Sequence, residues 1–390
     1  MNSHIFDIQP LHRFSGSNAA IRRPREIAYF SYDDEHNFRL DESSMQYYYP
    51  PQPSQLPLDL SAGFDTFQKL NDAPDEHLDA LLDTIVALEQ STEKKCEADI
   101  VTWRGMMTKI MTAPFDMLNG FEMNATYFQV SDSSALGSTG STDSRSAQGT
   151  IFIEENNSYK NAQKEIQKNQ RMPPGMPSQE MMAYWGYKFE AVSVIPNTWG
   201  ETSREKIEGR IHEVVNNKAQ YCSVVRTGFG KAKLVIGGEV DAIWDCKPVR
   251  KEDPINWVEL KTTAELINDK EKLKYERKLL KFWAQSFLLG VPKIVVGFRD
   301  RDGMLLRLEE LETHGLPGKV KREGRGSWDG NICINFTAAF LEWLQTVVNT
   351  EGTWRIRKRE KSPVIEVFKI EENGNGDILS SNFVAWRTKQ

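Results

Sequence analysis

Cysteine and histidine are scarce in this sequence, and neither forms a metal-binding pattern. The 390 residues include four cysteines and six histidines, and no two cysteines are separated by only two residues. Structural zinc sites and disulfide frameworks need several such residues at short, regular spacings. We therefore expect neither, and reduced cysteines fit an intracellular compartment.

A secretory leader and long apolar runs are also missing. Residues 1–7 do not place basic residues before an apolar stretch, and no later apolar run is long enough to span a bilayer. We therefore expect a soluble intracellular protein without a membrane partner. The net charge of −6 argues against a general nucleic-acid coat protein but leaves room for a local basic channel. The basic run at 355–361 could act as a nuclear address, so we expect the nucleus, with the cytoplasm as the alternative.

No internal repeat divides the chain, and the predicted elements do not follow a strict βαβ alternation. We expect an irregular N-terminal arm over 1–60 and a single catalytic domain over 61–390, with a flexible loop rich in serine and glycine at 131–149. Apolar periodicity predicts helices at 75–90, 262–290 and 336–349, and strands at 184–194, 233–245, 257–261 and 293–298. The fold class is thus α+β, with mixed β-sheets flanked by helices.

Two short strings carry most of the chemical information. Gly238-Glu239-Val240-Asp241 and Trp257-Val258-Glu259-Leu260-Lys261 each alternate apolar and polar residues, as a strand does. Residues two apart in a strand share a face, so Glu239 would lie beside Asp241, and Glu259 beside Lys261. If the two strands are neighbours, three carboxylates and an ammonium group meet. A buried cluster of this kind needs partners, and a divalent cation would supply one.

The alternative interpretation is two amphipathic strands whose polar residues face water. Against it, the apolar residues around the first string indicate a strand that is largely buried. An Asp followed by Glu-x-Lys is also typical of metal-dependent nucleases. A magnesium ion prefers oxygen ligands and keeps some of its waters, which suits carboxylates together with a substrate phosphate. A lysine in such a site can orient or deprotonate the attacking water.

Further motifs extend this pattern to a family. The arrangement resembles the catalytic core of PD-(D/E)XK nucleases, and more closely the DXO family of decapping nucleases, which includes the fungal partner of the nuclear 5′–3′ exoribonuclease. The motifs that carry the resemblance occur in order: Thr102-Trp103-Arg104-Gly105, Gly186-Tyr187-Lys188-Phe189-Glu190, Glu239-Val240-Asp241, Glu259-Leu260-Lys261, and Lys281 with Gln285. Each motif is weak alone, but their common order is specific.

The resemblance implies a role for each residue. The metal ligands would be side-chain oxygens of Glu190, Asp241 and Glu259 and the main-chain carbonyl of Leu260, while Glu239 would act through a metal-bound water. Lys261 and Gln285 would contact the scissile phosphate, and Arg104 would bind substrate phosphates nearby. Glu190 would also border the substrate. The implied cofactor is Mg²⁺ or Mn²⁺, with two ions.

The implied function is a metal-dependent hydrolase acting on RNA 5′ ends. Its substrates would be RNAs with a 5′-triphosphate, an incomplete cap or an NAD-type cap, and 5′–3′ degradation could follow. The alternatives are a DNA-acting PD-(D/E)XK exonuclease and a non-catalytic adaptor that stabilises a partner exoribonuclease. The aromatic residues near the acidic positions could stack on bases, although aromatics in strands more often form core. These residues are Trp185, Tyr187, Phe189, Trp244 and Trp257.

Overall fold

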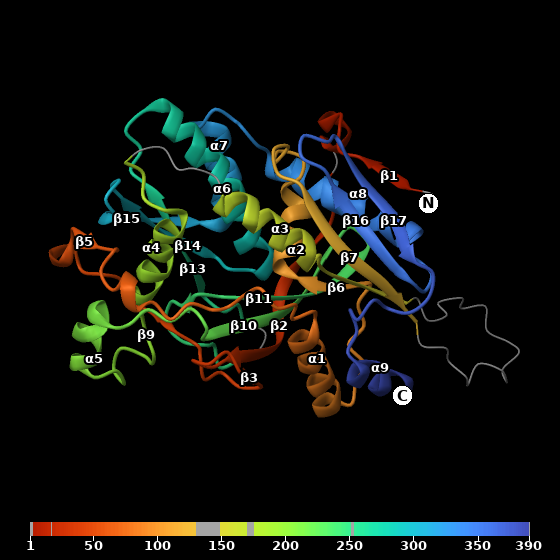
Figure 1. The fold of residues 1–390 in the computed structure, drawn as a ribbon, viewed down its shortest axis with the longest axis horizontal. Helices are drawn as coiled ribbons and strands as arrows, with labels where there is room; N and C mark the ends of the chain where they lie inside the picture. The colour runs from red at the N-terminus through yellow and green to blue at the C-terminus, as the bar shows by residue number, and fades with distance from the viewer. Residues whose placement is uncertain (1–2, 17, 130–148, 170–174, 251–252, 390) are drawn as a thin grey trace, which may run out of the picture.

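Two mixed β-sheets form the framework of the protein (Figure 1). The computed structural model describes residues 3–16, 18–129, 149–169, 175–250 and 253–389. The first sheet has the strand order β1-β17-β16-β7-β8-β6-β11-β10-β2-β3, and the second has the order β5-β15-β14-β13-β12-β4-β9. This architecture confirms the predicted α+β class with mixed sheets flanked by helices.

The strands of the first sheet are β1 (His4–Asp7), β2 (Ile21–Tyr32), β3 (Phe38–Arg39), β6 (Ile100–Trp103), β7 (Phe121–Phe128), β8 (Thr150–Glu155), β10 (Gln220–Phe229), β11 (Ala232–Glu239), β16 (Thr353–Lys358) and β17 (Val364–Glu371). Those of the second sheet are β4 (Tyr47–Tyr48), β5 (Leu58–Asp59), β9 (Val194–Ile195), β12 (Ala242–Ile243), β13 (Trp257–Ala264), β14 (Lys293–Arg299) and β15 (Met304–Glu312). The helices are α1 (Asp79–Thr92), α2 (Arg104–Thr112), α3 (Asn157–Lys168), α4 (Gln179–Val192), α5 (Arg204–Gly209), α6 (Asp269–Leu289), α7 (Leu316–Glu323), α8 (Gly330–Val347) and α9 (Ser381–Lys389).

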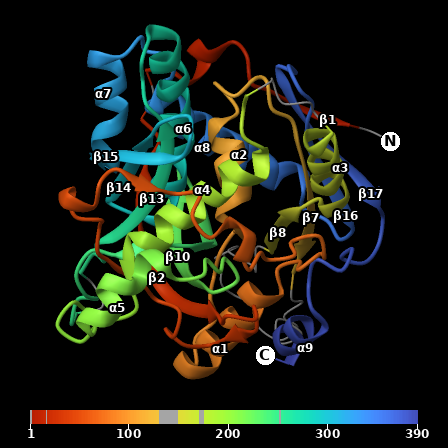
Figure 2. The ribbon, with the colours of Figure 1, turned by 60° about the vertical axis from the view of Figure 1, so that its left-hand side comes forward.

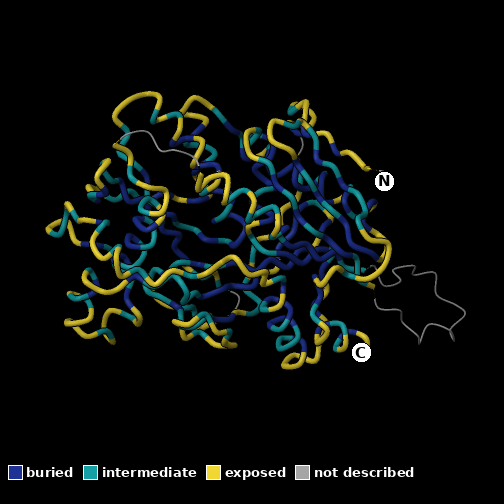
Figure 3. The backbone as a smooth tube through the Cα atoms, viewed as in Figure 1, coloured by how far each residue is buried: buried dark blue, intermediate teal, exposed yellow. Residues whose placement is uncertain are grey.

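Both faces of the central strands are buried, as the dark blue centre of Figure 3 shows. On β11, Leu234 and Ile236 pack into a core with residues of α2, α6 and α8, whereas Val235 faces a second core with residues of α1 and α9. Helix α6 contacts β10 and β11 of the first sheet and also β13 and β14 of the second. Helix α6 therefore joins the two sheets. The core that it shares with α2 and α8 extends over both of them.

A third core covers the other side of the second sheet. There α4 packs along β13 (Figure 2), and the buried side chains of Trp185 and Phe189 meet Val258, Leu260 and Val295. Because residues alternate along a strand, Glu259 and Lys261 of β13 lie on the opposite face from Leu260. The packing of α4 thus determines which side of β13 carries the polar groups.

The prediction of an irregular arm over 1–60 is wrong. Strand β2 is twelve residues long and pairs antiparallel with β10, and β1 pairs with β17 at the far edge of the same sheet. The arginines and the proline in β2 hid this strand, because its largely exposed residues do not alternate between apolar and polar. The single catalytic domain over 61–390 stays a prediction, and the loop at 131–149 lies almost wholly outside the described residues.

Two further predicted elements differ from the observed ones. Residues 184–192 form the end of α4 and not a strand, because Trp185, Phe189 and Val192 recur at helical spacing and Ser178 caps the helix by accepting from the Met181 N–H. Only Val194, at the end of the predicted range, belongs to a strand, the short β9. The predicted helix at 262–290 starts later, since β13 continues to Ala264 and Asn268 caps α6. The helix at 75–90 and the strand at 293–298 are confirmed within a few residues, and the helix predicted at 336–349 is found at Gly330–Val347, so it begins six residues earlier.

The basic run at 355–361 belongs largely to β16. Lys358 is buried, and Arg355 and Arg357 pair with Glu122 and Glu366. A basic run used inside a sheet does not suit an exposed nuclear address. Among the described residues, no helix is both long and apolar enough to cross a membrane.

Candidate active site

The predicted acidic residues meet where the chain passes from the first sheet to the second. Strand β11 ends at Glu239 in the first sheet, and β12 begins at Ala242 in the second. Asp241 lies at this crossing. The predicted continuous strand over 233–245 is therefore wrong, because the chain changes sheets at Val240 and Asp241. The condition that the two strings are neighbours is met, since Ala242 of β12 pairs with Val258 of β13.

Asp241 is held against the start of the Glu-x-Lys string. Its Oδ2 accepts a hydrogen bond from the main-chain N–H of Leu260 at 2.6 Å and lies 3.9 Å from the Nζ of Lys261. Asp241 is largely buried, with 9% of its side chain exposed. The pairing of β12 with β13 is what brings this carboxylate to the middle of β13.

Glu259 is the most deeply buried member of the cluster, with 0% exposure. Arg104 Nη1 donates to its Oε2 at 3.0 Å, and the Nζ of Lys261 lies 2.6 Å from its Oε1. Oε1 nonetheless has no hydrogen-bond partner, so its contact with Lys261 is an ion pair whose angles do not suit a hydrogen bond. A buried carboxylate between two cations excludes the alternative in which this glutamate simply faces water.

Glu190 comes to the site from α4. It lines a cleft together with Glu239 and Asp241, and Tyr187 and Asn217 are also part of its wall. Because α4 is a helix, Tyr187 and Glu190 are three residues apart and share the face that borders this cleft. The structure therefore brings together Arg104, Glu190, Glu239, Asp241, Glu259 and Lys261, which come from α2, α4, β11, the crossing and β13.

Burial and mutual repulsion dominate the electrostatics. Burial, with the nearby Asp241, raises the pKa of Glu239 to about 7, and burial, with Glu259, raises the pKa of Asp241 to about 6. Burial and Asp241 raise the pKa of Glu190 well above its usual value. Burial alone would raise the pKa of Glu259, but the charges of Arg104 and Lys261 outweigh it and lower that pKa. Burial would lower the pKa of Lys261, but Glu259 and Asp241 outweigh it and raise that pKa. Lys261 therefore stays charged, which favours orientation and charge neutralisation over deprotonation of water.

These shifts predict how the stability of the metal-free protein depends on pH. Folded Glu239 and Asp241 keep protons that the unfolded chain, with pKa values near 4.5 and 3.8, has lost. The free energy of unfolding should thus fall as pH rises from about 4 to about 7, by on the order of 3 kcal/mol for one group shifted this far. Glu259, whose pKa is lowered in the folded protein, makes the free energy of unfolding rise with pH, but only at acidic pH. Urea unfolding in EDTA should show a flatter dependence for Glu239→Gln, and parallel curves for both proteins would contradict the assignment.

The donor set suits a divalent metal ion in its chemistry. The groups offer oxygen atoms, and the buried Oε1 of Glu259 has no hydrogen-bond donor. As the side chains stand, no group of three or more histidine, cysteine, aspartate or glutamate residues in the described ranges is arranged to hold an ion. Arg104, Lys261 and the Leu260 N–H instead balance the carboxylates. The residues therefore fit the metal by type and burial, and the ligand set stays a prediction.

Lys281 and Gln285, the two residues expected from α6, form no hydrogen bond or ion pair with the acidic cluster among the described residues. Lys281 pairs with Asp116 at 3.0 Å, away from the acidic groups. Gln285 is half-buried, one turn before Leu289, and no hydrogen bond between its amide and the acidic side chains is recorded among the described residues. Its role at the scissile phosphate stays a prediction.

The aromatic residues divide between core and cleft. Trp185, Phe189 and Trp257 are buried in the cores, and Trp244 stacks on Tyr48 with ring centroids 4.8 Å apart. Tyr187 alone among the five lines the cleft described above. Sequence reasoning missed Arg210 and Asn217 in the cleft wall, because the segment between α5 and β10 has no periodic pattern.

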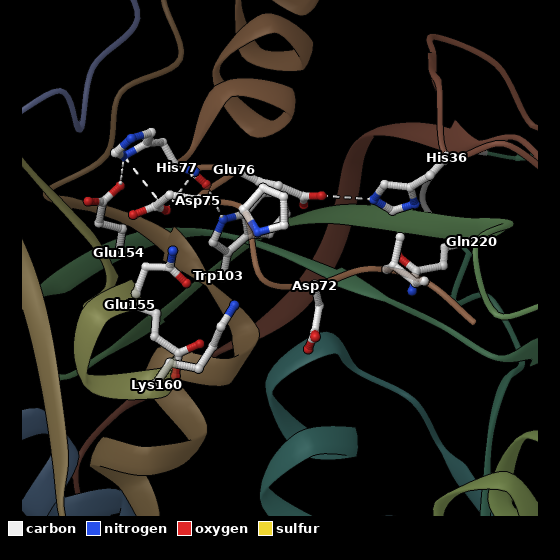
Figure 4. A pocket seen from close by; sticks show the side chains of 13 residues that line it. His36, Asp72, Asp75, Glu76, His77, Trp103, Glu154, Glu155, Lys160 and Gln220 are labelled. Atoms are coloured by element: carbon white, nitrogen blue, oxygen red, sulfur yellow. Dashed lines mark hydrogen bonds and ion pairs between the residues drawn. The ribbon is translucent and has the colours of Figure 1, made fainter. Parts of the chain in front are cut away.

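A second pocket lies next to this cleft and shares Gln220 with it. Its lining includes His36, Asp75, Glu76, His77, Trp103 and Glu154 (Figure 4). The pocket contains none of the predicted ligands, but Trp103 directly precedes Arg104. Figure 4 shows Trp103 beside His77, whose ring points to Glu154.

The fold and the site together define a class of protein. An acidic residue at the end of a buried strand, a following Asp at the crossing and a Glu-x-Lys strand beside them form the core of a PD-(D/E)XK nuclease. Comparison with known proteins narrows this class. The family described as RAI1-like PD-(D/E)XK nuclease matches residues 22–131 and 144–384, and the chain belongs to that family.

Individual relatives agree with this assignment. The chain is 65% identical over 388 residues to the decapping nuclease RAI1 of Emericella nidulans, covering 100% of this chain and 99% of the relative. It is 56% identical to the decapping nuclease RAI1 of Gibberella zeae, covering 98% and 96%. Among solved structures, Candida albicans Rai1 in complex with pU5 and Mn²⁺ superposes with a TM-score of 0.85 at 29% identity, covering 99% of each chain. Scheffersomyces stipitis Rai1 with (3′-NADP)⁺ and calcium also gives 0.85, at 27% identity, covering 99% of this chain and 100% of that one.

Proposed function

We propose that this protein is a metal-dependent hydrolase of RNA 5′ ends. Its reactions would be release of pyrophosphate from 5′-triphosphate RNA and removal of incomplete or NAD-type caps, with 5′–3′ degradation as a further activity. The observation that carries the proposal is the buried Glu259, held between Arg104 and Lys261 beside Asp241. The names of the relatives and the RNA in the Candida albicans complex support RNA as the substrate.

The cofactor in this proposal is Mg²⁺ or Mn²⁺, with two ions. Side-chain oxygens of Glu190, Asp241 and Glu259 and the carbonyl of Leu260 would hold the metal, and Glu239 would reach it through water. The bound metal would polarise the phosphate and lower the pKa of the attacking water. Manganese in one neighbouring structure and calcium in another support a divalent ion without fixing its identity.

The chain's own cations would act on the substrate. Lys261 is charged and lies at the edge of the cluster with 22% of its side chain exposed, so it can approach a phosphate oxygen while Glu259 holds its Nζ. Arg104 is more buried and directs one nitrogen to Glu259, so a phosphate would have to meet its remaining N–H groups. Gln285 would complete the contacts from α6.

This function predicts that the enzyme reads the 5′ phosphates and not the base sequence. Phosphate contacts position a substrate without specifying bases, and Arg104, Lys261 and Gln285 suit phosphate oxygens. With Mg²⁺, RNAs that differ in their first three bases should react alike, whereas replacing a 5′-triphosphate by a 5′-hydroxyl should lower the rate on the order of 100-fold. Strong dependence on the bases with indifference to the 5′ group would indicate an ordinary sequence-selective nuclease. Equal cleavage of matched DNA would favour the DNA-acting alternative.

We also propose a nuclear location and docking to the nuclear 5′–3′ exoribonuclease. The family resemblance supports both, and the intact acidic cluster argues against a role as a non-catalytic adaptor. Tagged protein purified from the nuclear fraction, and not from the cytoplasmic one, should carry the exoribonuclease with it. Failure of the two purified proteins to bind each other at micromolar concentrations would remove the docking proposal.

A further inference from the structure

Two adjacent glycines lie directly before Glu239 and allow Trp103 of the neighbouring strand β6 and Arg104, the first residue of α2, to lie against β11. Strand β6 pairs parallel with β11, and Trp103 is the register partner of Gly237. A Cβ atom at Gly237 would lie 2.7 Å from Cζ3 of the Trp103 ring, and one at Gly238 would lie 2.8 Å from the Cβ of Arg104. Such distances are too short for real contacts. The absence of side chains at both positions is therefore what allows Trp103 and Arg104 to lie against this strand.

Trp103 is also tied down on its polar edge. Its Nε1 donates to the main-chain oxygen of His77 at 3.0 Å, and the His77 ring nitrogen Nδ1 lies 2.9 Å from Oε2 of Glu154 (Figure 4). Glu154 is buried on β8, and β8 is the other neighbour of β6. The Trp103 ring additionally meets Phe30 edge to face at 6.2 Å. Three segments, at Phe30, His77 and Gly237, therefore contact this half-buried indole, and Glu154 holds His77 in turn.

The next residue along the chain is the one that reaches the catalytic cluster. Arg104 begins α2, and its Nη1 holds Oε2 of the fully buried Glu259. The Trp103 side chain caps no part of α2, since no side-chain cap is formed at the start of that helix. Its contacts with Gly237 and His77 hold the residue from which α2 starts, and α2 itself packs against α6 and α8. Arg104 directly follows this held residue and is the first residue of α2.

We propose that Trp103 is a positioning residue that acts on the reaction through Arg104, with Gly237 and Gly238 as the surface on which both residues lie. Within the described part of the chain, the indole N–H of Trp103 donates to His77 and not to the acidic groups. Its indole fixes the main chain at 103–104, so that Nη1 of Arg104 reaches Oε2 of Glu259. Glu259 and Lys261 then keep their positions beside Asp241. This inference rests on the proposed function, because its effect is read as turnover of RNA 5′ ends.

The test is a double-variant cycle with Trp103→Phe, which keeps a ring on Gly237 but removes the N–H donor. In the wild-type background, kcat should fall about five- to tenfold, as expected for one lost hydrogen bond, while KM changes less than twofold. In an Arg104→Lys background, the same substitution should change kcat less than twofold, because the guanidinium that it positions is gone. Trp386→Phe is a matched control, since the Trp386 Nε1 donates to Glu89 at 2.9 Å far from the site. It should leave kcat unchanged.

A glycine variant supplies an independent measurement. Gly238→Ala places a methyl group against Arg104 and should lower kcat at least as much as Trp103→Phe. Gly209→Ala, where an added Cβ meets nothing within 4 Å, should not. If Gly238→Ala fails to fold, the tryptophan cycle decides alone. Equal losses from Trp103→Phe in both backgrounds, or a raised KM with unchanged kcat, would overturn the proposal. A wild-type protein inactive on every RNA would instead overturn the proposed function.

Discussion

Asp241→Asn should reduce the turnover of RNA 5′ ends at least about 100-fold while the protein stays folded. The substitution keeps the size of the side chain and removes the charge that would serve a metal ion, and losing one stabiliser of transition-state charge costs about 10²- to 10³-fold. The asparagine oxygen can still accept from the Leu260 N–H, so the crossing between the sheets should survive. Burial and Glu259 already raise the pKa of this carboxyl, which means that the folded protein loses little stability with the charge.

The matched control for this prediction is Asp83→Asn on α1, a half-buried carboxylate that belongs to the far side of the first sheet. Its turnover should equal that of the wild type. Circular dichroism and thermal unfolding should superpose for all three proteins. A folded Asp241→Asn protein with turnover within a fewfold of the wild type would show that the reaction takes place elsewhere.

Arg104→Ala should destabilise the protein as well as inactivate it. The substitution removes one of the two cations at Glu259, whose carboxylate has no access to water, and a hydrogen bond to a buried charge contributes about 2 to 3 kcal/mol. The loss should shrink in Arg104→Ala combined with Glu259→Gln, because no uncompensated buried charge then remains. Denaturant unfolding at pH 7 measures both free energies.

A surface pair supplies the comparison. Arg204 contacts Glu208 at 2.6 Å on α5, with 88% and 62% of the two side chains exposed. Arg204→Ala should cost no more than about 1 kcal/mol, as solvent-exposed pairs usually do. Equal costs for Arg104→Ala and Arg204→Ala would mean that Glu259 is hydrated or protonated in the folded protein. The burial argument would then fail.

The chemical groups could be predicted from sequence better than the elements that carry them. Glu239, Asp241, Glu259 and Lys261 stand in two short strings, and the local alternation in each string was sufficient to group them. The change of sheet at Asp241 could not be predicted, because apolar residues flank it on both sides and indicate one buried strand. The change of sheet depends instead on pairing with a later strand, since Ala242 and Ile243 pair with Val258 and Trp257 of β13.

Two other errors have a physical cause in the tertiary structure. Aromatic residues favour strands when considered locally, but around Glu190 they form one buried side of a helix against β13. The partner of Arg104 could not be predicted either, since Glu259 lies 155 residues further along the chain. Pairings over such distances follow from the fold, and Trp103 gained its significance only once its contacts with Gly237 and His77 were known.

The central claim is that the acidic groups at the junction of the two sheets hold the catalytic metal. The most direct test is a crystal structure of the protein grown with Mn²⁺ and measured at the manganese absorption edge. We expect anomalous density bounded by Glu190, Asp241, Glu259 and the carbonyl of Leu260, and its loss in Asp241→Asn. Density absent from this position at saturating Mn²⁺, or found instead in the pocket of His36 and His77, would contradict the account.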